Sequence, residues 1–187
     1  MRHLPILVAP LLTLALLASS ARADDCGGRS VVTVHAGASA TGQSASPWVE
    51  LRWSASRDAP ARWEARVGSA ASLPLPGPEG TDDHAHLVVV APRTERHFAV
   101  IDAAADHEAA RRVRVYDARL RLVLALGLED LMTADELARV SRSVSHIRWL
   151  APEDPIRLDP DGETMHLALA SGRVVSVALG AAPRVLR

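Results

Sequence analysis

Residues 111–150, RRVRVYDARLRLVLALGLEDLMTADELARVSRSVSHIRWL, constrain the fold most strongly. Apolar and polar residues alternate along residues 113–117, and leucines alternate again along residues 120–126. A period of two residues is typical of strands that bury one face. Because the link at residues 117–119 is short, these strands are predicted to form an antiparallel hairpin.

A short helix is predicted directly after this hairpin. Thr133 is a suitable N-cap, and Glu136 follows it at the spacing of a capping box. So short a helix depends on tertiary packing, and Leu131, Leu137 and Val140 form an apolar stripe that can pack. We therefore expect the helix to cover an edge or a face of a β-sheet.

The first 23 residues, MRHLPILVAPLLTLALLASSARA, have the pattern of a secretory signal peptide. Arg2 precedes an apolar core at residues 4–17, and Ala21-Arg22-Ala23 provides small side chains at a cleavage site. Export to the periplasm or the extracellular space is predicted, with a mature chain that starts at Asp24. No later segment approaches the ~18 apolar residues of a membrane span, so no stable membrane insertion is expected after cleavage.

Cysteine content and charge restrict the class of protein further. Cys26 is the only cysteine, so the core must be stable without an internal disulfide bond. Removal of Arg2 and Arg22 reduces the 21 basic residues to 19, against 22 acidic residues, which gives a net charge of −3. This balance gives no reason to expect nucleic-acid binding.

After the signal peptide, the sequence predicts an N-terminal strand and flexible segment at residues 24–46 and a β-rich domain at residues 47–187. A further boundary is predicted near residues 73–82, where proline and glycine are frequent. The expected fold is mainly β, an open antiparallel assembly that is sandwich-like or a partial propeller. It should contain about ten short strands and one short helix, at about residues 133–142.

Aromatic and arginine side chains supply the candidate ligand-binding residues. Trp53 and Trp63 alternate onto core faces, whereas Trp48 falls on a polar face, where an indole suits sugar or peptide contact. The alternative for Trp48 is a place under the loop of residues 36–46.

Three arginines of the central hairpin form the second candidate. Arg112 and Arg114 share the polar face of one strand, and Arg121 can lie opposite. Guanidinium groups in such an array can bind phosphate or carboxylate through two parallel hydrogen bonds. The alternative is a solvated face that pairs with nearby carboxylates such as Asp102.

A possible metal site lies in the run Asp82-Asp83-His84-Ala85-His86. His84 and His86 would lie on the same side of a strand, an arrangement that suits zinc or another divalent ion. A catalytic site needs a third ligand and an ordered second shell, and no HExxH or comparable motif supplies one. The alternative is a solvated loop, and no other cofactor is predicted.

Two segments repeat a strand–turn–strand pattern, at residues 97–126 and 164–179. The first resembles a β-propeller blade, with Tyr116-Asp117 in place of an aromatic–aspartate pair. It departs from that pattern at Leu120, where blades usually have glycine for a left-handed backbone. A closed propeller needs roughly four or more blades, more than this chain provides. Residues 130–133 and 145–149 also resemble uncharacterised secreted bacterial β-rich proteins, a resemblance that implies no function.

The sequence therefore predicts an exported, non-enzymatic binding or scaffold module that contacts a protein or an envelope polymer. This prediction depends on the β-rich body, the strand arginines and the lack of a nucleophile motif such as G-x-S-x-G. The alternative is a small metal-dependent enzyme or metal-binding protein that uses Asp82, Asp83, His84 and His86.

Overall fold

The computed structural model describes residues 30–35, 48–56, 59–75, 86–103, 111–142 and 147–186. These residues are mainly β, with two short helices, and their strands form four sheets of which none closes into a barrel. The mainly β, open architecture predicted from the sequence is confirmed. The predicted signal peptide lies outside the described residues.

A central sheet organises the molecule, with the strand order β1-β5-β6-β7-β8. Its strands are β1 (Ser30–His35), β5 (His86–Ala91), β6 (His97–Asp102), β7 (Val113–Asp117) and β8 (Leu122–Leu126). The pair β1–β5 is parallel and the remaining pairs are antiparallel.

The predicted hairpin is formed by β7 and β8, but β8 starts at Leu122 and not at Leu120. Leu120 has a left-handed backbone with φ 61°, so it belongs to the turn. The Asp117 carboxylate accepts hydrogen bonds from the backbone N–H groups of Arg119 and Arg121, both at 2.9 Å, and these bonds stabilise the turn.

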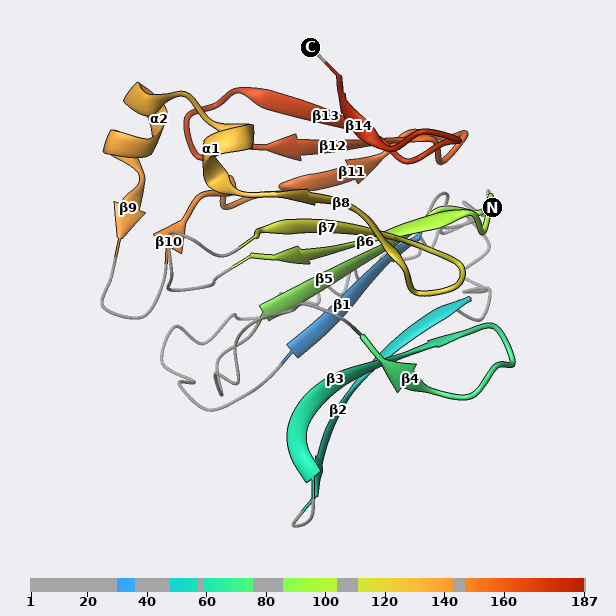
Figure 1. Cartoon of the computed structure of the whole chain (residues 1–187). Helices are drawn as coiled ribbons and strands as arrows, with labels where there is room; N and C mark the ends of the chain where they lie inside the picture. Colours follow the sequence, from blue (N-terminus) through green and yellow to red (C-terminus); the bar gives the residue numbers. More distant parts are fainter. Residues whose placement is uncertain are drawn as a thin grey trace, which may run out of the picture.

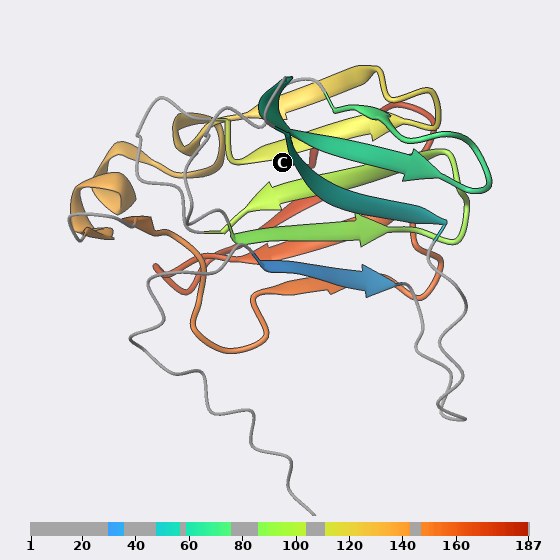
Figure 2. The ribbon, with the colours of Figure 1, turned by 90° about the horizontal axis from the view of Figure 1, so that it is seen from below.

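Two further sheets cover the two faces of the central sheet (Figures 1 and 2). The C-terminal sheet contains β11 (Ile156–Leu158), β12 (Thr164–Ala168), β13 (Val174–Ala178) and β14 (Arg184–Leu186). The N-terminal sheet contains β2 (Val49–Ser56), β3 (Ala59–Val67) and β4 (Leu73–Pro74). The central sheet is therefore covered on both faces, which the sequence did not predict. Part of the predicted boundary near 73–82 belongs to β4, and residues 76–82 lie outside the described ranges.

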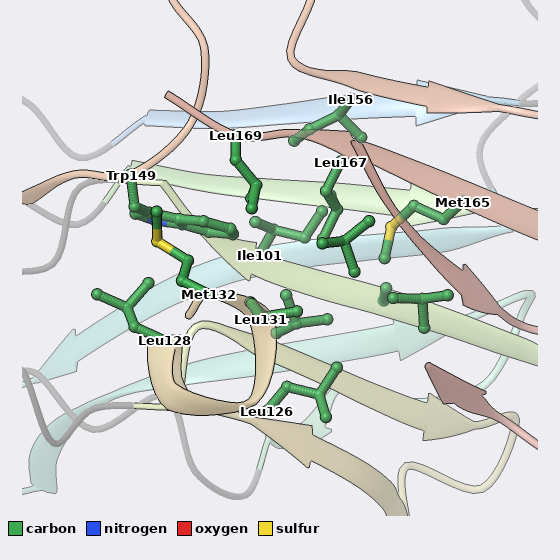
Figure 3. Close-up of a cluster of buried hydrophobic side chains, with 14 of the residues drawn as sticks. Ile101, Leu126, Leu128, Leu131, Met132, Trp149, Ile156, Met165, Leu167 and Leu169 are labelled. Carbon is green, nitrogen blue, oxygen red and sulfur yellow. The ribbon is translucent and has the colours of Figure 1, made fainter. Parts of the chain in front are cut away.

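The first hydrophobic core fills the space between the central and C-terminal sheets (Figure 3). Ile101 and Leu126 contribute from the central sheet, and Met165 and Leu167 contribute from β12. Trp149 is fully buried in this core, and its indole N–H donates to the Asp102 backbone carbonyl at 3.0 Å. That bond satisfies the one polar atom of the ring.

Two short helices, α1 (Leu128–Leu131) and α2 (Ala134–Arg139), lie at one end of these sheets (Figure 1). The predicted capping box at Thr133 is confirmed, because its hydroxyl accepts from the Glu136 N–H and the Glu136 carboxylate accepts from the Thr133 N–H. The predicted end at residue 142 is wrong, since Ser141–Arg142 form β9, which pairs with β10 (Ile147–Arg148). In the described part of the chain, no helix is long and apolar enough to cross a membrane.

A second core lies on the opposite face of the central sheet. Phe98 stacks on Tyr116, with ring centroids 5.4 Å apart, and both side chains are fully buried. Trp63 is buried in this core, as predicted. Trp53 was expected there too, but it is only half-buried at the core margin, with its ring 5.2 Å from that of Trp63.

Candidate functional site

Arg112 and Arg114 lie inside the protein, with exposed fractions of 0 % and 3 %. Successive residues of β7 point to opposite faces of the sheet, and Val113 and Val115 belong to the first core. The two arginines therefore lie with Tyr116 on the opposite face of the central sheet, the face of the second core. Their predicted exposure is wrong because that face is covered as well, and ligand binding there stays a prediction.

Asp102 lies beside Arg112 on the same face of the central sheet. Its backbone N–H donates to the Arg112 carbonyl at 2.8 Å, and both side chains are buried. Opposite charges are thus placed together where water is scarce, which lowers the cost of burying each of them.

Arg121 does not join the buried arginines. Its side chain is exposed and forms an ion pair with Asp117 within the β7–β8 turn, at 2.6 Å. Partial desolvation raises the pKa of Asp117, but hydrogen bonds from Arg121 and Arg119 outweigh it and hold that pKa below its usual value. The structure therefore separates Arg121 from Arg112 and Arg114, with which the sequence grouped it.

Trp48 is half-buried at the margin of the second core. Its indole N–H donates to the Pro92 carbonyl at 2.7 Å, and its ring meets Phe98 edge to face at 5.8 Å. The polar atom of the ring is therefore bonded within the protein. Residues 36–46, the alternative cover, lie outside the described residues.

The predicted metal ligands Asp82, Asp83 and His84 lie outside the described residues, and only the backbone of His86 is described, at the start of β5. The described part of the chain contains no group of three or more His, Cys, Asp or Glu side chains that could hold a metal ion. Metal binding at residues 82–86 stays a prediction.

A pocket of about 340 Å³ opens beside α2. Its lining residues are Met132, Glu136, Arg139, Val140, Ala170 and Ser171. The Glu136 carboxylate accepts hydrogen bonds from Arg173, at 2.6 and 2.9 Å, and from the Ser171 hydroxyl at 2.7 Å. The bonds from Arg173, Thr133 and Ser171 hold the pKa of Glu136 far below its ordinary value. This carboxylate stays ionised and ties α2 to the β12–β13 turn, so we assign it a structural role.

Asp159, His166 and Ser176 form a hydrogen-bonded row on the outer face of the C-terminal sheet. His166 Nδ1 lies 2.9 Å from Ser176 Oγ, and His166 Nε2 lies 2.9 Å from Asp159 Oδ1. The sequence did not predict this row, because no local motif marks it. The available signal was the strand–turn–strand pattern of residues 164–179, which places His166 opposite Ser176 in the hairpin register.

Apolar side chains are exposed along β8, at the edge of the central sheet. Leu122 is 44 % exposed and Val123 is 43 % exposed. No other described strand pairs with the outer side of β8. An apolar edge strand of this kind is a template for pairing with another strand.

Comparisons with known proteins identify no relatives: no protein-family model matches the chain, and no curated protein or solved structure is significantly similar to it. Function must therefore be argued from the geometry of these sites.

Proposed function

We propose that this protein is an exported scaffold module that binds a second copy of itself through the open edge of β8. The observation that carries the proposal is the exposure of Leu122 and Val123 on an edge strand. Pairing of two such strands satisfies backbone groups and removes apolar surface from water together.

Backbone geometry supports pairing at this edge. The Asp117 N–H donates to the Arg121 carbonyl at 3.0 Å, so the adjacent pair Tyr116 and Leu122 is of the non-hydrogen-bonded type. Leu122 therefore turns its own N–H and C=O away from β7, towards the open side. A partner strand would meet a donor and an acceptor there.

Charge at the two ends of β8 favours a second copy in the antiparallel direction. Arg119 and Arg121 precede the strand, and Glu129 and Asp130 follow it. All four residues are exposed, although Arg111 already pairs with both carboxylates. Antiparallel pairing places the basic end of each β8 opposite the acidic end of the other. Exposed ion pairs contribute only about 0–1 kcal/mol, so charge fixes the direction while the apolar contact supplies affinity.

The opposite edge of the central sheet is not equivalent. β1 occupies that edge and lies next to β11 of the C-terminal sheet. Pairing through β8 alone is isologous, with the same surface in both copies, and it closes at two copies. The expected product is a two-fold dimer.

Export is the second part of the proposal and is supported by the signal-peptide pattern of residues 1–23. The dimer would assemble in the periplasm or the extracellular space from chains that start at Asp24. Intact-mass measurement of the exported protein tests this start, and an exported product that retains Met1 would contradict it.

Light scattering coupled to size-exclusion chromatography tests the dimer. The mature protein should elute as a dimer, and the double variant Leu122→Lys/Val123→Lys should elute as a monomer with an unchanged circular dichroism spectrum. Val174→Lys is the matched control, because Val174 is a β residue that is 56 % exposed on β13 of the C-terminal sheet. The control should stay dimeric. A monomeric wild type at the highest soluble concentration, or a double variant that stays dimeric, would overturn the proposal.

A further inference from the structure

We infer that Ser176, His166 and Asp159 form a site that hydrolyses acyl esters on the outer face of the C-terminal sheet. This activity goes beyond the proposed scaffold role and does not depend on it. The three residues lie within hydrogen-bond distance in the order nucleophile, base and orienting carboxylate. That order is the structural signature of an activated serine.

The two hydrogen bonds favour one tautomer of the neutral imidazole ring of His166. An ionised carboxylate can only accept, so the bond between His166 Nε2 and Asp159 Oδ1 places the proton on Nε2. Nδ1 then has a free electron pair, which accepts the Ser176 hydroxyl proton at 2.9 Å. In serine proteases Nε2 accepts from serine and Nδ1 donates to aspartate, so the two nitrogens have exchanged roles in this protein. The chemistry requires only that one nitrogen accepts from serine and the other donates to aspartate.

The ladder of β12 and β13 holds the serine and the histidine close together. Hydrogen bonds from the Leu169 N–H to the Arg173 carbonyl and from the Leu179 N–H to the Glu163 carbonyl share the register of His166 and Ser176. Hydrogen-bonded pairs alternate with non-hydrogen-bonded pairs, so His166 and Ser176 form a non-hydrogen-bonded pair. Side chains approach most closely in pairs of this type.

Asp159 is positioned by the turn between β11 and β12. Its N–H donates to the Thr164 carbonyl at 2.9 Å, and its carbonyl accepts from the Gly162 N–H at 2.8 Å. Gly162 has φ 74°, a conformation that glycine adopts without strain. The orienting carboxylate therefore depends on the turn formed by residues 159–162.

Two arginines on the same face supply positive charge. Arg157 lies opposite His166 in the β11–β12 ladder, and Arg184 lies opposite Ala178 on β14, next to the strand of Ser176. The Ser176 N–H points towards β14 and not into solvent, so it cannot stabilise an oxyanion at this face. A guanidinium group is the remaining donor for that charge.

The open face determines the class of substrate. The pocket beside α2 is lined by other residues, and His166 and Asp159 are each partly exposed on a sheet surface. Such a surface does not exclude large substrates, so it can reach an acyl ester carried on a polymer chain. Arg157 and Arg184 favour a polymer with negative charge near the ester.

The reaction is ester plus water to carboxylic acid plus alcohol. Ser176 Oγ attacks the carbonyl carbon while its proton passes to His166 Nδ1. The bond to the alcohol oxygen then breaks, and the departing alkoxide takes that proton from Nδ1. Water attacks the acyl-serine, gives one proton to His166, and releases the acid as the proton returns to Ser176 Oγ. Asp159 stays ionised and stabilises the imidazolium that forms in each step.

Two probes test this assignment on the mature protein: hydrolysis of p-nitrophenyl acetate, and labelling by a fluorophosphonate followed by peptide mass spectrometry. Wild type should hydrolyse the ester and carry the label on Ser176. Ser176→Ala should lose both, and His166→Asn should lower the rate by about 10² or more.

Asp159 and the controls separate catalysis from folding. Asp159→Asn should lower the rate and slow the labelling of Ser176 without a change of fold, because it removes the carboxylate that orients His166. Ser141→Ala changes an exposed serine of β9 and should keep the full rate and label. All variants should keep the wild-type circular dichroism spectrum and elution volume. Absence of label on Ser176, or an unchanged rate in folded Ser176→Ala, would overturn the assignment whether or not the protein is a dimer.

Discussion

The two faces of the central sheet bury different kinds of side chain. The face towards the C-terminal sheet is apolar and includes Ile101, Val113 and Val115. The opposite face buries the aromatic rings of Phe98 and Tyr116 and also the charged Arg112 and Arg114. β7 and Arg112, the residue that precedes it, therefore supply valines to one side and arginines to the other.

This difference indicates that the first core mainly stabilises the fold, whereas the second mainly determines how the sheets are placed. Apolar burial contributes about 25 cal/mol for each Å² removed from water, whereas a buried charge costs free energy unless other groups compensate it. The first core should therefore supply most of the free energy of folding. The second should depend on defined contacts, such as the buried neighbours Asp102 and Arg112, that fix how the sheets are placed.

The largest expected effect distinguishes the two cores through their tryptophans. Trp149→Ala should lower the free energy of unfolding by about 3–5 kcal/mol, because this ring is fully buried in the first core. Trp53→Ala should cost clearly less, since Trp53 is half-buried at the margin of the second core. Urea unfolding of both variants measures the difference. Equal losses of the free energy of unfolding would contradict the view that the first core contributes more to stability than the second.

The pattern of a strand predicted its position but not what covers it. The hairpin, the Thr133 cap and the strand–turn–strand pattern of residues 164–179 depend on neighbouring residues, and the structure contains all of them. Alternation along β7 predicted one buried face and one solvated face. The burial of Arg112 has a non-local cause, the cover on the second face, which no window of sequence contains. The charge of Arg112 predicted contact with solvent, because the segments that cover this residue are distant in the sequence.

The candidate sites also divide into features set by neighbouring residues and features set by distant segments. Arg121 and Asp117 were close in sequence and proved close in space, but Arg121 was wrongly grouped with Arg112 and Arg114. The row of Asp159, His166 and Ser176 depends on the pairing of three strand segments, so it becomes visible only when the register is known. The leucines of residues 120–126 were predicted to share one buried face, which is wrong for Leu122, because this residue is 44 % exposed on a strand at the edge of the sheet.

A smaller effect tests the polar side of the second core. Tyr116 is the only tyrosine, and burial raises its pKa to about 12 from 10.0, while the nearby Arg114 charge opposes that rise. A raised folded-state pKa means that this stabilisation is complete below pH 10.0 and is lost as pH rises to about 12. The loss should reach roughly 3 kcal/mol.

Ultraviolet titration of tyrosinate measures this pKa directly, because no second tyrosine contributes. Arg114→Met should raise it further, since the opposing positive charge is removed. A wild-type titration near pH 10.0 in the folded protein would show that the second core is open to water and that Tyr116 is not buried in it.

The smallest effect concerns the turn between β7 and β8. Leu120 has φ 61°, a conformation that costs an L-residue roughly 1–2 kcal/mol, yet its side chain is buried in the second core. Burial of leucine contributes about 1.5–3 kcal/mol, which explains why leucine is tolerated where glycine is usual. Leu120→Ala loses the burial and keeps the strain, whereas Leu120→Gly loses both. Leu120→Gly should therefore be more stable than Leu120→Ala by about 1 kcal/mol in urea unfolding, the reverse of their order in an ordinary strand. If alanine is the more stable of the two, the left-handed backbone is not strained, and side-chain burial alone decides the stability of this turn.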